Sequence, residues 1–136
     1  MKYFTIDELC KSNVAEQKGI DNTPNLHQYR NLVKMVDNLL DPIREMWGDI
    51  IIINSGFRCE ELNKAVGGVE NSDHKKGCAV DMRARDIRDN GELFTKIVES
   101  GLPFRQIIWE QGNRDYPKWI HISYVENDNK RQIIRP

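Results

Sequence analysis

The chain has 136 residues, of which 39% are hydrophobic and 30% charged, and we expect a single globular domain over residues 1–136. The net charge of -1 provides no basic stripe for a phosphate backbone, which excludes a nucleic-acid partner. No apolar run approaches the ~20 residues that span a bilayer, which excludes a membrane partner.

The first predicted elements are helices. Thr5 to Glu8 has the pattern of a capping box, in which the first side chain caps a helix and the last reaches back, so a short helix is predicted here. Residues 19–24 contain glycine and proline and are predicted to form a loop. Apolar residues then recur at helical spacing over 26–47, which predicts a long amphipathic helix with Asn25 as its cap.

Pro42 interrupts the pattern of this long helix. It is predicted either to kink the helix or to start a second helix with Asp41 as the cap. Gly48 is predicted to end the helix. The β-branched run over 49–54 follows and predicts a short buried strand.

The remaining elements alternate between strands and short helices. We predict a short helix over 59–65, a polar loop over 69–78, a strand over 79–84, a helix from Asp89 or Asn90 to about Ser100, and strands over about 105–110, 118–125 and 130–134. This order predicts an α+β domain with a mostly antiparallel sheet flanked by helices.

The cysteines and the first residues bear on the cellular setting. The chain has three widely spaced cysteines, Cys10, Cys59 and Cys78, and no CxxC motif. This argues against a disulfide framework and against a thiolate zinc site. We expect buried, reduced thiols. The segment from Met1 to Glu8 has no apolar signal core, so cytoplasmic synthesis without a signal peptide is expected.

Two histidines and one aspartate are candidates for a metal site. His74 lies in the polar loop, and Asp81 follows seven positions later within a strand, with Gly77 allowing a tight turn between them. His121 is on the polar face of the strand over 118–125. Two histidines and a carboxylate with an open fourth position form a catalytic zinc set, but each residue alone is more often a surface or hydrogen-bonded side chain.

Five motifs in a fixed order carry a family resemblance. They are Ser55-Gly56-Phe57-Arg58, Leu62-Asn63, Val66-Gly67-Gly68, the segment from Ser72 to Asp81, and Trp119-Ile120-His121-Ile122-Ser123. This set resembles the zinc D-alanyl-D-alanine carboxypeptidase family, which includes phage endolysins and shares its fold with the signalling domain of hedgehog proteins. The resemblance implies a hedgehog/DD-peptidase-like single domain with one Zn2+ per chain, held by His74, Asp81 and His121.

The resemblance also implies roles for Arg58 and Ser72. Arg58 matches the arginine that stabilises the oxyanion, a role suited to a guanidinium that donates in a fixed fork. Its alternative is an ion pair with Glu60, Glu61 or another acid. Ser72 matches a residue near the metal that binds substrate or positions His74, and its alternative is a loop cap.

The general base is less well defined. Some family members carry an acid three residues before the last histidine, where this chain has Lys118. Glu110 ends the strand over 105–110 and is our candidate, because antiparallel pairing with the strand that carries His121 places it near the metal. Asp115 is the reserve candidate, and the alternative for Glu110 is a solvated strand end.

Three further groups of residues complete the predicted site. Aromatic residues expected in the core rather than in a substrate groove are Trp109, Trp119 and Tyr124. Candidate cations for a terminal carboxylate are Arg83, Arg85 and Arg114. Loop residues expected to be solvated are Asp73, Lys75 and Lys76.

These observations predict a zinc-dependent hydrolase of peptide bonds in peptidoglycan stem peptides. Both a D-Ala-D-Ala carboxypeptidase and an endolysin-type endopeptidase fit the residues. We expect a monomer of phage or prophage type whose partner is a peptidoglycan peptide, and which acts on the cell wall after release. Lys118 favours the alternative, a catalytically silent metal-containing module that binds the cell wall or belongs to a phage structure.

Overall fold

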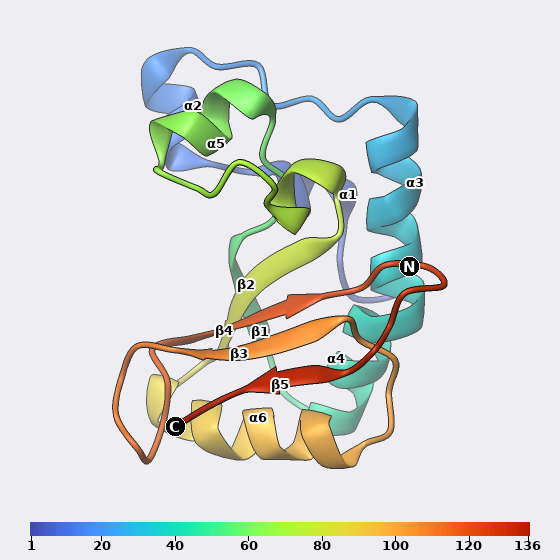
Figure 1. The fold of residues 1–136 in the computed structure, drawn as a ribbon, viewed down its shortest axis with the longest axis vertical. Helices are drawn as coiled ribbons and strands as arrows, with labels where there is room; N and C mark the ends of the chain where they lie inside the picture. The colour runs from blue at the N-terminus through green and yellow to red at the C-terminus, as the bar shows by residue number, and fades with distance from the viewer.

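The computed structural model describes residues 1–136 and contains one five-stranded sheet flanked by helices (Figure 1). The strands are β1 (Ile51–Ser55), β2 (Ala79–Ala84), β3 (Gln106–Glu110), β4 (Trp119–Ser123) and β5 (Gln132–Ile134), in the order β1-β2-β4-β3-β5. Neighbouring strands are antiparallel except β3 and β5. After β4 the chain turns back past β3, so β5 runs parallel to β3. The α+β class with a mostly antiparallel sheet is confirmed.

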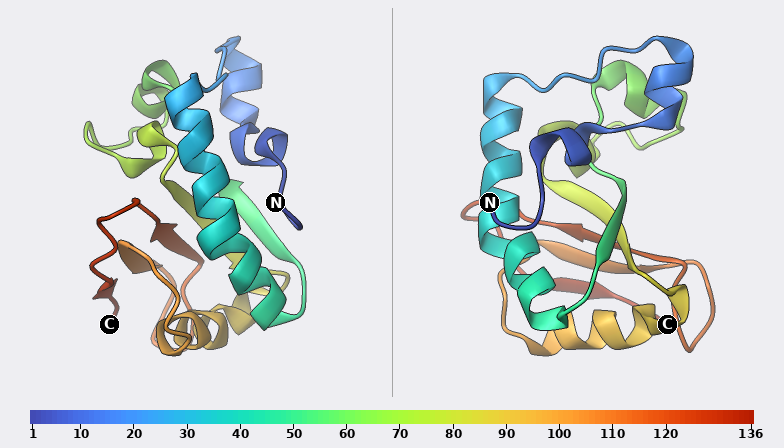
Figure 2. Two further views of the ribbon diagram at one scale, coloured as in Figure 1. Left: turned by 90° about the vertical axis from the view of Figure 1, so that its right-hand side faces the viewer. Right: turned by 180° about the vertical axis from the view of Figure 1, so that it is seen from behind.

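Helices cover one face and both ends of the sheet (Figures 1 and 2). They are α1 (Ile6–Cys10), α2 (Asn13–Lys18), α3 (Leu26–Met35), α4 (Asp41–Trp47), α5 (Glu60–Ala65) and α6 (Asn90–Glu99). A π-helical turn, η1 (Val36–Leu40), and two 3-10 turns, η2 (Asp73–Lys76) and η3 (Ile87–Asp89), complete the elements. None of the helices combines the length and the apolar character needed to cross a membrane.

Side-chain caps define the first helices. The Thr5 hydroxyl accepts a hydrogen bond from the Glu8 amide at 3.1 Å, which confirms the predicted start of α1. Helix α2 was not predicted, although its local signals are present. Ser12 caps its first turn, and Gly19 ends it with a φ of 65° that suits glycine.

The long helix accommodates Pro42 without ending. Asn25 and Gln28 form a reciprocal capping box at its start, and Gly48 ends it at a φ of 77°. Between them the chain passes through the π-helical turn η1, which continues directly into α4. The prediction that Asp41 acts as a cap is wrong, because its carboxylate accepts hydrogen bonds from the amides of Lys2 and Tyr3 instead.

The start of α6 also differs in detail. Asp89 stands at the cap position without a side-chain hydrogen bond to the helix. The buried Asn90 amide instead accepts from the Ala84 amide at 2.8 Å and donates to the carbonyls of Pro117 and Lys118. This side chain therefore ties the end of β2 to the start of β4.

The two faces of the sheet have different surroundings. One face carries a continuous apolar set that is fully buried against the long helix and α6: Val80, Met82, Ile107, Ile120 and Ile122. Side chains alternate along a strand, so the intervening residues point to the opposite face. That opposite face carries Asp81, His121, Ile108 and Glu110 and holds the candidate site.

The expectations for the aromatic residues and thiols are partly confirmed. Trp109 is buried in the core and Tyr124 packs against it, whereas Trp119 lines the site pocket described below. All three cysteines are free, with Cys78 buried and the other two half-buried. Burial raises the pKa of the Cys10 and Cys78 thiols to about 11.

Candidate metal centre

Two of the candidate ligands come from adjacent strands. Asp81 on β2 and His121 on β4 are direct partners in the antiparallel register. Directly opposite residues share a face of the sheet, so both side chains point toward the open face. The Asp81 Oδ1 atom lies 3.0 Å from His121 Nδ1.

The third candidate, His74, is held by its own turn. The Ser72 hydroxyl accepts from the His74 amide at 3.2 Å, and Gly77 ends the turn at a φ of 76°. The buried His74 ring places Nδ1 at 2.8 Å from the Gly56 carbonyl oxygen. Nδ1 therefore donates to this carbonyl, which turns Nε2 toward Asp81 Oδ1 at 3.3 Å.

The three side chains fit a zinc ion. One potential ligand atom from each of His74, Asp81 and His121 lies within 4.8 Å of the other two. Two ligands bound tetrahedrally at about 2.0–2.1 Å from zinc are about 3.4 Å apart, close to the observed separations of 3.0 and 3.3 Å. A hydrogen-bonded second nitrogen on His74 is also typical of metal-binding histidines.

The electrostatics of Asp81 favour the ligating state. Burial raises the pKa of this carboxyl, but hydrogen bonds from His121 and His74, together with their charge, outweigh burial and hold it below its ordinary value. The carboxylate is therefore ionised at neutral pH, as a metal ligand must be.

Arg58 lies beside this set. Its guanidinium donates to Ser55 Oγ at 3.1 Å and to Asn63 Oδ1 at 3.0 Å, and lies 3.5 Å from Asp81 Oδ2. The predicted alternative of an ion pair therefore applies to Asp81 rather than to Glu60 or Glu61. Burial lowers the pKa of Arg58, and the charge of Asp81 opposes that shift.

Gly68 packs directly against this arginine. A Cβ atom at this position would overlap Asn63 Oδ1 and lie 2.7 Å from Arg58 Nη1. A larger residue here would displace Asn63 or Arg58, so Gly68 lets the segment after α5 lie against the guanidinium.

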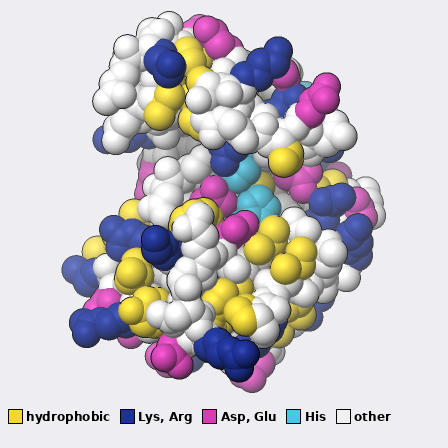
Figure 3. Space-filling model, turned by 60° about the vertical axis from the view of Figure 1, so that its left-hand side comes forward, with side chains coloured by type: hydrophobic (Ala, Val, Ile, Leu, Met, Phe, Trp, Pro, Cys, Tyr) yellow, Lys and Arg dark blue, Asp and Glu magenta, His cyan; other side chains and the backbone are white.

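The three candidate ligands open onto a pocket of about 420 Å³. Figure 3 shows histidine and acidic side chains gathered in a hollow on this face. Glu110 and Ser72 also line the pocket. Glu110 is opposite Trp119 in the register, on the same face as His121, whereas Lys118 is exposed and outside the pocket. Asp115 lines a separate hollow beside α6, so the structure does not bring it to the metal centre.

Ser72 is a loop cap, which was its predicted alternative, and it also orients His74. Its hydroxyl caps η2, which is the turn that carries His74. The side chain is therefore a loop cap that orients the first candidate ligand, and it lies at the wall of the pocket.

The cations of the site differ from those predicted. None of Arg83, Arg85 and Arg114 lines the pocket; Arg85, for instance, pairs with exposed Asp49 at 3.0 Å. Arg105, which the sequence did not single out, lines it and pairs with Asp73 at 2.9 Å. It precedes β3 by one residue, and no motif marks it.

The loop residues around His74 are less solvated than predicted. The prediction for Asp73 is wrong, because its side chain is 9% exposed and bound to Arg105 and Lys76. Lys75 is also partly buried and pairs with Glu60. Lys76 is exposed, as expected.

A comparison with protein families matches residues 2–123 to the family model described as Peptidase M15. The chain belongs to the peptidase M15 family. This family is zinc-dependent, which agrees with the metal-ligand geometry of His74, Asp81 and His121 and supports a zinc metallopeptidase. No curated protein matches the chain.

Proposed function

We propose that this M15 peptidase hydrolyses a peptide bond in peptidoglycan stem peptides and binds one zinc ion through His74, Asp81 and His121. The observation that carries the proposal is the convergence of the three ligand atoms at an open pocket that Arg58 and Glu110 also line. When bound there, zinc would lower the pKa of a water molecule and polarise the scissile carbonyl.

Glu110 is the proposed general base. Its strand register puts it on the same face as His121 and in the same pocket, which supports a role in taking a proton from water. It then passes this proton to the leaving amine. The presence of Glu110 in the pocket supports the enzyme over the silent module, because it supplies an acid where Lys118 does not.

Arg58 is the proposed oxyanion stabiliser. A guanidinium has five N–H donors, and three of them face Ser55, Asn63 and Asp81. The others remain available to a developing negative charge at the pocket. Ser72 supports the site by holding the turn of His74 at the pocket wall.

The charges in the pocket favour an endopeptidase over a carboxypeptidase. Both cations that line it are already paired with acids, Arg58 with Asp81, and Arg105 with Asp73 and Asp128. A terminal carboxylate at the metal centre would therefore compete with Asp81, Asp73 and Asp128 for these cations. We include in this proposal the endolysin-type setting, in which the protein acts as a monomer on the wall after release; that setting stays a prediction from the sequence.

The test begins with zinc content and then measures cleavage. Purified protein is expected to hold about one zinc per chain, and His121→Ala to lose it, whereas the control His27→Ala, which changes an exposed histidine on α3, keeps it. Protein with zinc should release new amino groups from purified peptidoglycan, and chelator should abolish this release.

A second variant tests the role of Glu110. Glu110→Gln should keep its zinc but lower kcat by a factor of about 10²–10⁴, the usual contribution of general acid–base catalysis.

Two outcomes of the zinc and cleavage measurements would contradict the proposal. Chelator-insensitive cleavage would exclude the metal mechanism. Full zinc occupancy without cleavage would favour the silent binding module.

A further inference from the structure

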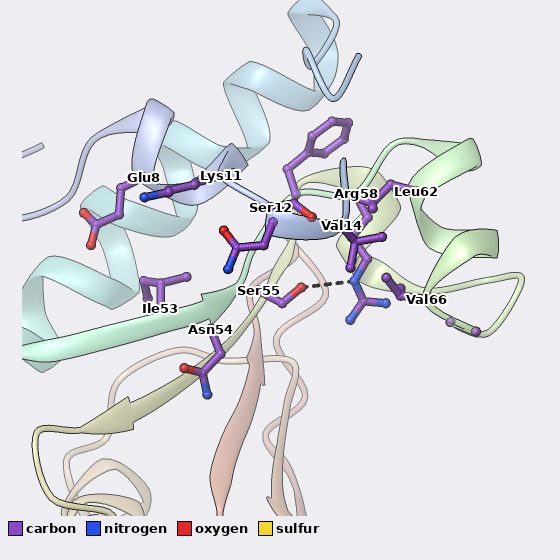
Figure 4. Close-up of a pocket in the computed structure, with 14 residues that line it drawn as sticks. Glu8, Lys11, Ser12, Val14, Ile53, Asn54, Ser55, Arg58, Leu62 and Val66 are labelled. Carbon is purple, nitrogen blue, oxygen red and sulfur yellow. Dashed lines mark hydrogen bonds between the residues drawn. The ribbon is translucent and has the colours of Figure 1, made fainter. Parts of the chain in front are cut away.

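A second groove, whose lining is drawn in Figure 4, shares Arg58 with the pocket of the candidate metal ligands. Its volume is about 690 Å³, compared with about 420 Å³ for the metal pocket. It is bounded by the connection between α1 and α2, the end of β1, and the segment from α5 to Gly68. Of these walls, the metal site described above uses Arg58 and two residues that contact it, Ser55 and Gly68.

The groove and the metal pocket meet at the Arg58 side chain. Arg58 lines both, and the loop after α5 passes between them, with Gly68 on the wall of the groove and Val69 on the wall of the metal pocket. The two hollows therefore adjoin at Arg58, and a peptide that occupied both would cross this residue.

The lining of the groove suits a peptide. Val14 and Val66 supply apolar surface, and Val66 is 44% exposed although it is a large hydrophobic residue. Asn13 and Asn54 supply amide donors and acceptors. Asn54 stands at an irregularity in the register of β1 with β2, so it has no partner across the strands.

Lys11 is the cation that the groove offers to an anionic ligand. The other charged residues of its lining are Glu8 and Arg58, and Arg58 is already paired with Asp81. Lys11 forms no ion pair in the structure, in contrast to Lys75 and Lys76, which pair with acids beside the metal centre. An unpaired ammonium at the edge of a groove is a suitable partner for a carboxylate.

We propose that this groove binds the part of the substrate peptide that extends beyond the scissile bond, and that Lys11 pairs with a carboxylate on that part. The inference rests on the proposed peptidase function and adds a requirement to it. A substrate must be long enough to pass Arg58 and must carry a free carboxylate away from the cleaved bond.

The test compares two soluble stem-type peptides with zinc-loaded protein. They differ only in one side carboxylate distant from the scissile bond, which is free in one peptide and amidated in the other. KM and kcat are measured where turnover occurs, and Kd by calorimetry where it does not. Lys11→Ala should raise KM or Kd for the free-carboxylate peptide roughly tenfold, the loss expected for one charge-assisted contact, and leave kcat unchanged.

Three controls isolate the charge of Lys11. Lys11→Arg should retain affinity. Lys18→Ala changes an exposed lysine at the end of α2, outside the groove, and should have no effect. For the amidated peptide, Lys11→Ala and the native protein should bind equally.

Each outcome separates this inference from the proposed function. Cleavage that does not depend on Lys11 overturns the inference and leaves the peptidase intact. Carboxylate-dependent binding without cleavage supports the groove and overturns the peptidase. Binding that requires attached glycan, rather than the peptide carboxylate, overturns the inference in favour of a sugar in the groove.

Discussion

The two sides of the metal centre are built in different ways. Asp81 and His121 lie on paired strands, and the backbone ladder sets their separation. His74 lies on a short 3-10 turn that the sheet does not position. A ligand fixed by strand register depends on many backbone bonds that no single side chain supplies, whereas a ligand on a turn depends on individual contacts.

Those individual contacts come from several parts of the chain. The Arg58 amide donates to the His74 carbonyl at 3.1 Å. Side chains on α3 hold the next two carbonyls of the turn, with Gln28 donating to Lys75 and Asn31 to Lys76. Substitutions on α3, far from the pocket, should therefore disturb the position of His74 and leave the positions of Asp81 and His121 unchanged.

The largest expected effect is the loss of zinc affinity on removing the charge of Asp81, a ligand on a strand. Asp81→Asn should weaken zinc binding by roughly 100-fold or more, because loss of a ligand exceeds the 10–100-fold cost of losing an outer partner. The fold should remain, since the strand ladder does not involve the carboxylate. Competition with a chromophoric chelator measures the affinity, and Asp49→Asn, an exposed acid paired with Arg85, is the control. Unchanged zinc affinity would remove Asp81 from the metal site.

The next effect concerns the backbone of the turn. Gly77→Ala should lower the free energy of unfolding by about 2 kcal/mol or more, because a left-handed residue costs about 1–2 kcal/mol and the new Cβ meets the Gln28 carbonyl oxygen at 2.5 Å. Urea denaturation measures the loss. Gly19→Ala is a matched control, since Gly19 has a similar φ of 65° but open space around it. Equal losses in the two variants would mean that the contact with Gln28 contributes nothing.

A smaller effect tests the support from α3. Gln28→Ala removes the hydrogen bond to the Lys75 carbonyl and the capping-box bond from the Asn25 amide, and should destabilise the protein by about 1–2 kcal/mol. It should also weaken zinc binding several-fold, because His74 loses part of its anchoring. Asn38→Ala is the control, since this amide bonds to the Lys34 carbonyl within its own helix. Stability loss with unchanged zinc affinity would show that the turn holds His74 without α3.

The same contrast explains what could be predicted from sequence. The spacing of His74, Gly77 and Asp81, and the alternation around His121, made these residues candidates, and the family resemblance implied that the three side chains meet at one metal. Glu110 could be placed because antiparallel register follows from strand order. Alternation and pairing are local rules, and they therefore predict the strand-borne part of the site well.

Side-chain contacts between distant loops follow no such rule. The pairing of Arg105 with Asp73 joins two segments whose approach depends on the complete fold, so Arg105 was not singled out and Asp73 was wrongly expected to be solvated. The π-helical turn before Pro42 and the parallel pairing of β5 were likewise missed, because neither leaves a periodic pattern. The role of Glu110 as base stays a prediction.

The smallest expected effect is a change in the reactivity of the Cys78 thiol, which lies where the turn that carries His74 meets the strand that carries Asp81. Cys78 is located between η2 and β2, and burial raises its pKa to about 11, so little thiolate exists at pH 8 and alkylation should be slow. Cys10 has a pKa raised to about the same value and is not part of this junction. If contacts from α3 restrain the turn, Gln28→Ala should accelerate iodoacetamide labelling of Cys78 and not of Cys10, as measured by mass spectrometry. Equal acceleration at both cysteines would indicate global loosening, and His74 would then depend on overall stability rather than on its own contacts.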